Sequence, residues 1–380
     1  MKKYLILILF LNLSLFGENF TPSKVCKACH PLVYKEYVES MHYNSSIFRD
    51  KIHKKIFSIH PLSKKEKYQC AKCHTPTDEK LLKDLNSTDP ALPKIDSQGQ
   101  KEAISCAYCH RIKDIKKHAK MNENIINSNQ KYFFAEDENI KGVKKYTLKK
   151  GLFAKQSGSP YHTIDATNPL YKNAKVCMGC HSHKQNKNGF TVCKTEFSKD
   201  AKQNCITCHM PKVSGSFANH IDSKTHRYHG FAGVFNKPEF LEKYIELTLK
   251  TDKNIEIEIT NLAPHKLFLH PLRAAAIKIS VTNAGRKVLE DEKMFSKIFG
   301  KNGTPAPVWE ATEVLQDTIL NAKESTKISL NYMPKKGDNI KIEFGYYIVN
   351  PGIAKKLNLE EFSKFKVLKT IENKIYTNSD

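Results

Sequence analysis

The sequence predicts a chain of two domains. Residues 18–238 are expected to form an α-plus-irregular domain with short helices, and residues 239–380 an all-β, sandwich-like domain. The first part carries five copies of the unit Cys-x-x-Cys-His and shows only weak periodicity. In the second part, apolar and polar residues alternate with the period of two that half-buried strands require. These two observations define the predicted fold class.

The repeated Cys-x-x-Cys-His unit is the attachment signature of haem c. Two intervening residues let both cysteines form thioethers with adjacent edges of one porphyrin, and the next histidine then lies under the iron as proximal ligand. The units contain ten of the eleven cysteines and predict five covalently attached haem c groups. The attachment residues are Cys26, Cys29, Cys70, Cys73, Cys106, Cys109, Cys177, Cys180, Cys205 and Cys208, and the proximal ligands are His30, His74, His110, His181 and His209.

Paired cysteines also serve two purposes other than haem attachment. Structural zinc sites also take Cys-x-x-Cys pairs, but zinc explains neither a histidine after every pair nor an odd number of pairs. A two-residue loop can also close as a redox disulfide. The histidine at every unit favours haem over both alternatives.

Five haems within residues 18–238 leave about 40 residues of chain for each, too few for a conventional hydrophobic core. The porphyrins are therefore expected to form the core. We expect short helices after each unit, with helices at Val33–Ser40 and Glu79–Leu85. Asn86–Gln100 is expected to be a loop, and Asn122–Lys150 a surface excursion.

The second domain is predicted from short alternating segments separated by turn residues, which suggest a small β-sandwich. A helix is expected at Gly352–Phe365. No cysteine follows residue 208, so this domain is not expected to attach a haem. The expected strands are Tyr244–Leu249, Ile255–Ile259, Ala276–Val281, Lys327–Asn331 and Asn339–Phe344.

Residues 1–17 resemble a secretory signal peptide, because a short basic start precedes the apolar run Tyr4–Phe16. Cleavage after Gly17 is expected to release a periplasmic protein without stable membrane insertion, with uncleaved anchoring as the alternative. Haem c attachment takes place outside the bacterial cytoplasm, which agrees with export.

The net charge of +23 raises the question of nucleic-acid binding. The lysines are scattered, and no nucleic-acid-binding motif accompanies them. The propionates of five haems would also offset much of the charge. The expected partners are instead redox proteins, either a membrane quinol-oxidising complex or a periplasmic oxidoreductase, which a basic surface would attract.

Several motifs resemble the multihaem c-type cytochromes, the superfamily of the tetrahaem electron acceptor of hydroxylamine oxidoreductase and of pentahaem nitrite reductase. The resemblance lies at Cys26–Pro31, Ser40-Met41-His42, Ser159–His162, Cys208–Pro211 and His229–Gly233. It implies a distal iron-ligand role for His42 and suggests similar roles for His162 and for His226 or His229. His220 is a further candidate, and His265 is an even choice between a ligand and a turn residue. His60 and His270 precede prolines and are expected to be structural.

Electron transfer is the favoured function, because all five units end in histidine. The resemblance associates catalysis in pentahaem nitrite reductase with a lysine at that position. The alternative is an oxidoreductase for a small nitrogen or sulfur compound, acting at an open haem or at one ligated by Cys193, the odd cysteine. Lys194 beside it is expected to lower the pKa of this thiol. A docking subunit of a larger redox complex is a third possibility.

Overall fold

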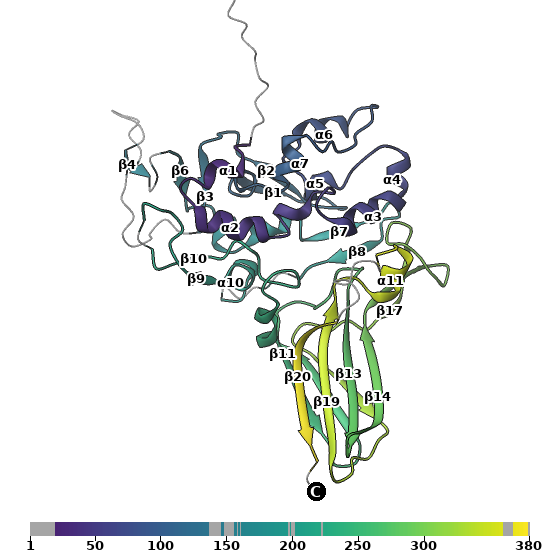
Figure 1. Cartoon of the computed structure of the whole chain (residues 1–380). Helices are drawn as coiled ribbons and strands as arrows, with labels where there is room; N and C mark the ends of the chain where they lie inside the picture. Colours follow the sequence, from purple (N-terminus) through teal and green to yellow (C-terminus); the bar gives the residue numbers. More distant parts are fainter. Residues whose placement is uncertain are drawn as a thin grey trace, which may run out of the picture.

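The computed structural model describes residues 20–136, 146–147, 156–157, 159, 161–196, 198, 202–221, 223–359 and 368–378. Figure 1 shows an N-terminal part of short helices and small hairpins standing on an elongated β domain. The predicted signal peptide lies outside the described residues. Within the described part, no helix is long and apolar enough to cross a membrane.

Short elements make up the N-terminal part, as predicted. α2 and α3 are its longest helices, with nine residues each. The helices are α1 (Ser23–Cys26), α2 (Pro31–Glu39), η1 (Tyr43–Ser45), α3 (Lys51–Ile59), α4 (Pro61–Lys64), α5 (Ala71–His74), α6 (Glu79–Asp84), α7 (Gln98–Glu102), α8 (Cys106–Cys109), α9 (Pro169–Lys172), η3 (Lys175–Gly179) and α10 (Cys205–His209). The strands are β1 (Ile112–Lys116), β2 (Glu123–Ile126), β3 (Tyr132–Phe134), β4 (Tyr146–Thr147), β5 (Gln156–Ser157), β6 (Thr163–Asp165), β7 (His183–Gln185), β8 (Thr191–Lys194), β9 (Lys212–Ser214) and β10 (Thr225–Arg227).

Each Cys-x-x-Cys-His unit forms a helical turn of its own. In the first unit, the His30 amide donates to the Cys26 carbonyl at 2.8 Å, and the second to fourth units repeat this bond. Side-chain caps begin two of the turns: Ser105 at α8 and Asn204, in a capping box, at α10. The prediction of a helix after every unit is wrong: α2 follows the first, but strands β1, β7 and β9 follow the third, fourth and fifth. Haem attachment requires a helical turn only within the unit, where the turn brings both cysteines to one side. The element that follows the unit can therefore be a helix or a strand.

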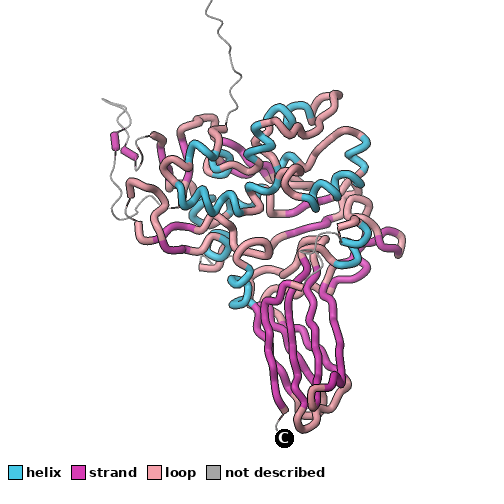
Figure 2. The backbone as a smooth tube through the Cα atoms, viewed as in Figure 1, coloured by secondary structure: helices cyan, strands magenta, loops and turns pink. Residues whose placement is uncertain are grey.

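Two antiparallel sheets form the body of the C-terminal domain, and a third sheet has the order β16-β15-β17. Figure 2 shows the long strands running along the length of the domain. One sheet has the order β11-β12-β18 and the other β14-β13-β19-β20. Ile257, Ile277 and Ile342, all fully buried, belong to the hydrophobic core that both sheets share. The elements are η4 (Pro238–Tyr244), β11 (Ile245–Lys250), β12 (Ile255–Asn261), β13 (Ala274–Asn283), β14 (Arg286–Phe295), β15 (Lys297–Lys301), β16 (Thr304–Pro305), β17 (Glu313–Asp317), β18 (Ser325–Leu330), β19 (Asp338–Tyr347), α11 (Pro351–Lys356) and β20 (Lys369–Thr377).

The expected strands of this domain are all present, within three residues at each end. Sequence alternation missed β14, whose outward residues are mostly charged, and β20, which forms the edge of the larger sheet. The expected helix Gly352–Phe365 is shorter: α11 covers Pro351–Lys356, and residues 360–367 lie outside the described part.

The two parts of the chain pack directly on each other. Asn186, after β7, donates to the carbonyls of Val308 and Ala311 at 2.9 and 2.7 Å. The rings of His60 and Trp309 lie 4.7 Å apart. Ile52 of α3 is part of the β-domain core cluster. The division at residue 238 stays a prediction, but the β domain plainly closes one side of the N-terminal part.

Candidate multihaem site

A single large cavity of about 2620 Å³ occupies the N-terminal part and its junction with the β domain. All eleven cysteines and all five motif histidines line it. All eleven cysteines are free thiols. In the described part of the chain, no three or more His, Cys, Asp or Glu side chains are grouped to hold a metal ion. The N-terminal part is thus built around a shared, largely apolar space.

Four motif histidines each face a second histidine across this space. Two nitrogen–metal bonds of about 2 Å, plus about 1.1 Å from each ring centre to its nitrogen, would separate two imidazole centroids on opposite sides of one metal by about 6.2 Å. The observed centroid separations are 6.4 Å for His30 with His162, 6.1 Å for His42 with His181, 6.3 Å for His110 with His229 and 6.2 Å for His209 with His265. The residues therefore fit paired axial ligation of four irons.

Backbone carbonyls hold the motif rings in the required orientation. His30, His110 and His209 each place Nδ1 2.7–2.8 Å from a carbonyl oxygen, those of Phe217, Phe134 and Ala232. Because Nδ1–H donates to this oxygen, the Nε2 lone pair points into the cavity. The carbonyls come from segments far along the chain, so folding of the whole domain fixes each ring.

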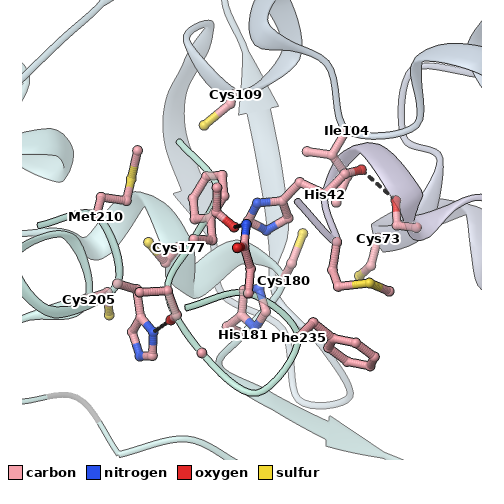
Figure 3. Close-up of a pocket in the computed structure, with 18 of the residues that line it drawn as sticks. His42, Cys73, Ile104, Cys109, Cys177, Cys180, His181, Cys205, Met210 and Phe235 are labelled. Atoms are coloured by element: carbon pink, nitrogen blue, oxygen red, sulfur yellow. Dashed lines mark hydrogen bonds between the residues drawn. The ribbon is translucent and has the colours of Figure 1, made fainter. Parts of the chain in front are cut away.

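Three of the facing histidines, His42, His162 and His229, are held in the neutral form that binds a metal. Burial, followed by the charge of His181, lowers the pKa of His42 to about 3. Burial and then the charge of His110 lower the pKa of His229 to about 3, and burial and then the charge of His30 lower that of His162 to about 4. Figure 3 shows His42 directed towards His181, with Cys177 and Cys180 of the same motif beside them.

The structure separates the two alternatives His226 and His229. Both ring nitrogens of His226 bond to protein groups: Nδ1 lies 2.9 Å from the Gly215 carbonyl and Nε2 3.0 Å from Glu36 Oε1. His229 instead uses only Nδ1, at 2.7 Å from the Arg227 carbonyl. Its Nε2 is left for the cavity, so the geometry favours His229 as the ligand.

The remaining candidates have weaker positions. His220 lines the cavity near His30. Burial lowers the pKa of His30, a hydrogen bond to the Phe217 carbonyl raises it, and the charge of His220 lowers it by a smaller amount. His220 forms no ring pair with a motif histidine in the described part of the chain. His60 caps α4, with Nδ1 accepting from the Leu62 amide at 3.1 Å, as expected of a structural residue.

His74, of the second motif, is the exception among the proximal histidines. Its nearest aromatic neighbour is His53, with the centroids only 4.1 Å apart, which is too close for a metal between the rings. His53 places Nδ1 3.3 Å from the Ser45 carbonyl and Nε2 3.2 Å from the Tyr68 hydroxyl. His270 also lines the cavity, but its Nδ1 accepts from the Leu272 amide at 3.2 Å, which puts the ring proton on Nε2.

Cys193 lies on β8, opposite Lys184 of β7. Burial raises the pKa of the thiol, and Lys184 and Lys297 offset that effect only in part. The expectation that Lys194 activates this cysteine is therefore wrong: the cation that acts on it is across the hairpin, and burial dominates. Cys193 lines the cavity as a protonated thiol.

Comparison with known proteins agrees with this architecture. Residues 25–111 match the family described as cytochrome c554 and c-prime. The fold is similar to the crystal structure of a penta-heme cytochrome c552 from Thermochromatium tepidum, with a TM-score of 0.71 and 22% identity over 94% of this chain and 99% of that one. No curated protein sequence matches. The chain is thus similar to c-type cytochromes in its N-terminal segment and in its overall fold. The resemblance to multihaem c-type cytochromes is confirmed.

Proposed function

We propose that this chain is an exported, periplasmic pentahaem cytochrome c that relays electrons between redox partner proteins. The observation that carries the proposal is the set of four facing histidine pairs. Each pair joins the histidine of a Cys-x-x-Cys-His unit to a histidine elsewhere in the chain, with ring centroids 6.1–6.4 Å apart. The family match and the shared fold support haem c as cofactor and electron transfer as role.

The ten motif cysteines would attach the haems, and the five motif histidines would be proximal ligands. His162, His42, His229 and His265 would be the distal ligands opposite His30, His181, His110 and His209. When bound, haem supplies a one-electron iron centre whose potential two histidines keep lower than a histidine and a methionine would. The protein's part is to fix eight imidazoles in a buried, largely apolar space.

The order of the motifs in space supports a relay. Cysteines of different motifs lie close enough to shift one another's pKa: Cys26 with Cys106, Cys73 with Cys180, and Cys177 with Cys205. The first motif therefore adjoins the third, and the fourth adjoins the second and the fifth.

Asn124 joins these two groups. Its amide nitrogen lies 3.2 Å from the hydroxyl of Tyr108, in the third motif, and 3.6 Å from Cys180 Sγ, in the fourth. All five attachment points form one connected series. Such a series suits transfer through the protein better than five independent sites would.

Haem counting and EPR spectroscopy of the ferric protein test the proposal together. A pyridine haemochrome ratio of five per chain, with at least four low-spin irons, is expected. A ratio below four, or a majority of high-spin iron, would refute it. The mass of the periplasmic protein tests export separately, because cleavage after Gly17 removes a calculable amount.

His74 favours an oxidoreductase as the second candidate function. No histidine faces it at the separation of the other four pairs in the described part of the chain. An iron held there without a sixth protein ligand would be open to a small nitrogen or sulfur compound. A high-spin signal of one iron per chain that changes on adding nitrite, hydroxylamine or sulfite would support this function.

The β domain is better explained as part of the haem array than as a docking module. His265 and Arg273 of its 262–273 segment line the cavity. Partners would instead be attracted by the basic surface of the whole chain, whose net charge is +23 before haem propionates are counted. Reduction by an acidic partner should therefore slow as ionic strength rises.

A further inference from the structure

Glu36, in helix α2, binds two residues of the segment that carries the facing histidine His229. Its Oε2 accepts from the His229 amide at 2.9 Å, and its Oε1 lies 3.0 Å from Nε2 of His226. These partners lie 193 and 190 residues along the chain from Glu36, so folding of the whole N-terminal part brings them together. One carboxylate thus holds the ligand segment, residues 226–229, at two points.

The ring of His229 is oriented through the backbone of this ligand segment. Its Nδ1 lies 2.7 Å from the carbonyl of Arg227, two residues earlier. Strand β10, whose ladder with β9 fixes the backbone, ends at Arg227. Beyond that strand the amide of His229 itself bonds to Glu36. A displacement of the segment would carry the imidazole with it, and the bond to Glu36 opposes such a displacement.

His226 makes the carboxylate a stable acceptor in this buried position. Its Nδ1 lies 2.9 Å from the carbonyl oxygen of Gly215, which can only accept, so Nδ1 carries a hydrogen. Its Nε2 faces Glu36, so a further proton is held between these two groups. An imidazolium and a carboxylate in contact compensate each other's charge away from water. The second oxygen of Glu36 is then free to accept from the His229 amide.

Helix α2 is anchored without the help of Glu36. It begins directly after His30, the histidine of the first motif, which is the residue that precedes its first turn. The hydroxyl of Tyr37, a buried side chain of the same helix, donates to the Glu102 carbonyl at 2.9 Å. Replacing Glu36 would leave both anchors in place. Glu36 therefore extends from a fixed support towards the ligand segment.

We propose that Glu36 is a positioning residue that holds His229 opposite His110. This inference rests on the proposed function, in which these two histidines bind the iron of the third motif. Glu36 does not line the cavity, so it acts through the backbone of the ligand. Because α2 begins at His30, the helix that follows the first motif also supports an axial ligand of the third.

Removing the carboxylate should loosen the axial ligand. A hydrogen bond to a charged acceptor is strong enough to change an equilibrium on the order of tenfold. In Glu36→Ala the fraction of protein with His229 detached should therefore rise on the order of tenfold. Binding of an external ligand such as cyanide to one iron per chain should increase with that fraction.

Two further variants separate the geometry of Glu36 from its charge. Glu36→Gln keeps an oxygen that accepts from the His229 amide and gains an NH₂ group that can donate to Nε2 of a neutral His226. It should therefore behave as the wild type. Glu36→Asp keeps the charge but is one methylene shorter, so it should resemble Glu36→Ala.

The low-spin EPR signal of the same iron gives a second measurement. The ring planes of His110 and His229 lie at 22° to each other, whereas those of His42 and His181 lie at 71°. The g-values of a low-spin ferric haem depend on this angle between its two imidazoles. Glu36→Ala should therefore shift or broaden one low-spin signal. A general loss of stability would not change one signal alone.

The test is EPR spectroscopy and cyanide titration of the full-length ferric haem protein, with haem content measured on every sample. Glu39→Ala is the matched control, because Glu39 is an exposed residue of the same helix and does not line the cavity. His229→Gln, which removes the ligand itself, identifies the signal that belongs to this iron.

The inference is supported if Glu36→Ala, with five haems bound, alters the signal that His229→Gln removes, while Glu36→Gln and Glu39→Ala match the wild type. If Glu36→Ala matches Glu39→Ala in both measurements, Glu36 does not position the ligand. Should Glu36→Ala fail to fold, wild-type behaviour of Glu36→Asp would contradict the inference. If His229→Gln itself changes no signal, the proposed ligand pair is wrong instead.

Discussion

Replacing His229 and His226 separately by Gln gives the sharpest test of the ligand arrangement. The two residues are three positions apart, yet their rings make different contacts. His229 faces His110 at 6.3 Å, whereas both nitrogens of His226 bond to Gly215 and Glu36. His229→Gln should therefore convert one iron in five to the high-spin state, whereas His226→Gln should convert none.

The expected cost of His226→Gln is in stability. The His226 side chain is 1% exposed and that of Glu36 is 12% exposed, so the pair is shielded from water. Removing one partner of a buried pair costs about 3 kcal/mol. Glu36 also accepts from the His229 amide at 2.9 Å, and this bond does not involve the His226 side chain, so the ligand loop should stay in place in His226→Gln.

Integrated EPR intensity of the ferric proteins, with haem content and urea unfolding on the same samples, measures both effects. His118→Gln, an exposed histidine outside the cavity, is the control. A high-spin signal in His226→Gln, with His229→Gln fully low-spin, would refute the reasoning that engaged nitrogens exclude a ligand role.

Three further predictions follow from the same structure. His265→Ala should also yield one high-spin iron per chain by EPR, and added imidazole should return it to low spin. Cys193→Ser should leave the haem spectrum unchanged, because burial keeps the thiol protonated. Burial lowers the pKa of His60, so the unfolded chain binds the proton first and the unfolding free energy should fall as the pH drops below about 6.5. His60→Gln should reduce that pH dependence, followed by fluorescence of Trp309, the single tryptophan, which lies against His60.

The haem-attachment motifs were predictable from the sequence because all of their functional side chains lie within five consecutive residues. Cys26 to His30 form one helical turn, and the spacing alone specifies two thiols and an imidazole on one side. The β strands were also predictable, because alternation such as that of Ile255, Ile257 and Ile259 reports a buried face directly. Both are properties of short segments.

Long-range placement was not available from the sequence. Nothing local distinguishes His226 from His229, because the difference is a carboxylate on α2, almost 200 residues earlier. The same holds for His265, which lies opposite His209 only when the β domain is in place. The sequence therefore left undecided which histidines face the motif histidines across the cavity.

The C-terminal domain shows why these long-range residues matter. A cap that only excluded water would present apolar side chains to the cavity, as Leu267 and Phe268 do. Instead the 262–273 segment presents His265 at 6.2 Å from His209, and the guanidinium of Arg273 also lines the cavity. A ligand and a charge are expensive to bury unless the cofactors meet them, so folding of this domain and loading of the haem array should be coupled. A chain ending before residue 239 would then lack the imidazole facing His209. In such a chain the fifth-motif iron should be high-spin even if all ten cysteines were attached, a result that EPR of the truncated protein can contradict.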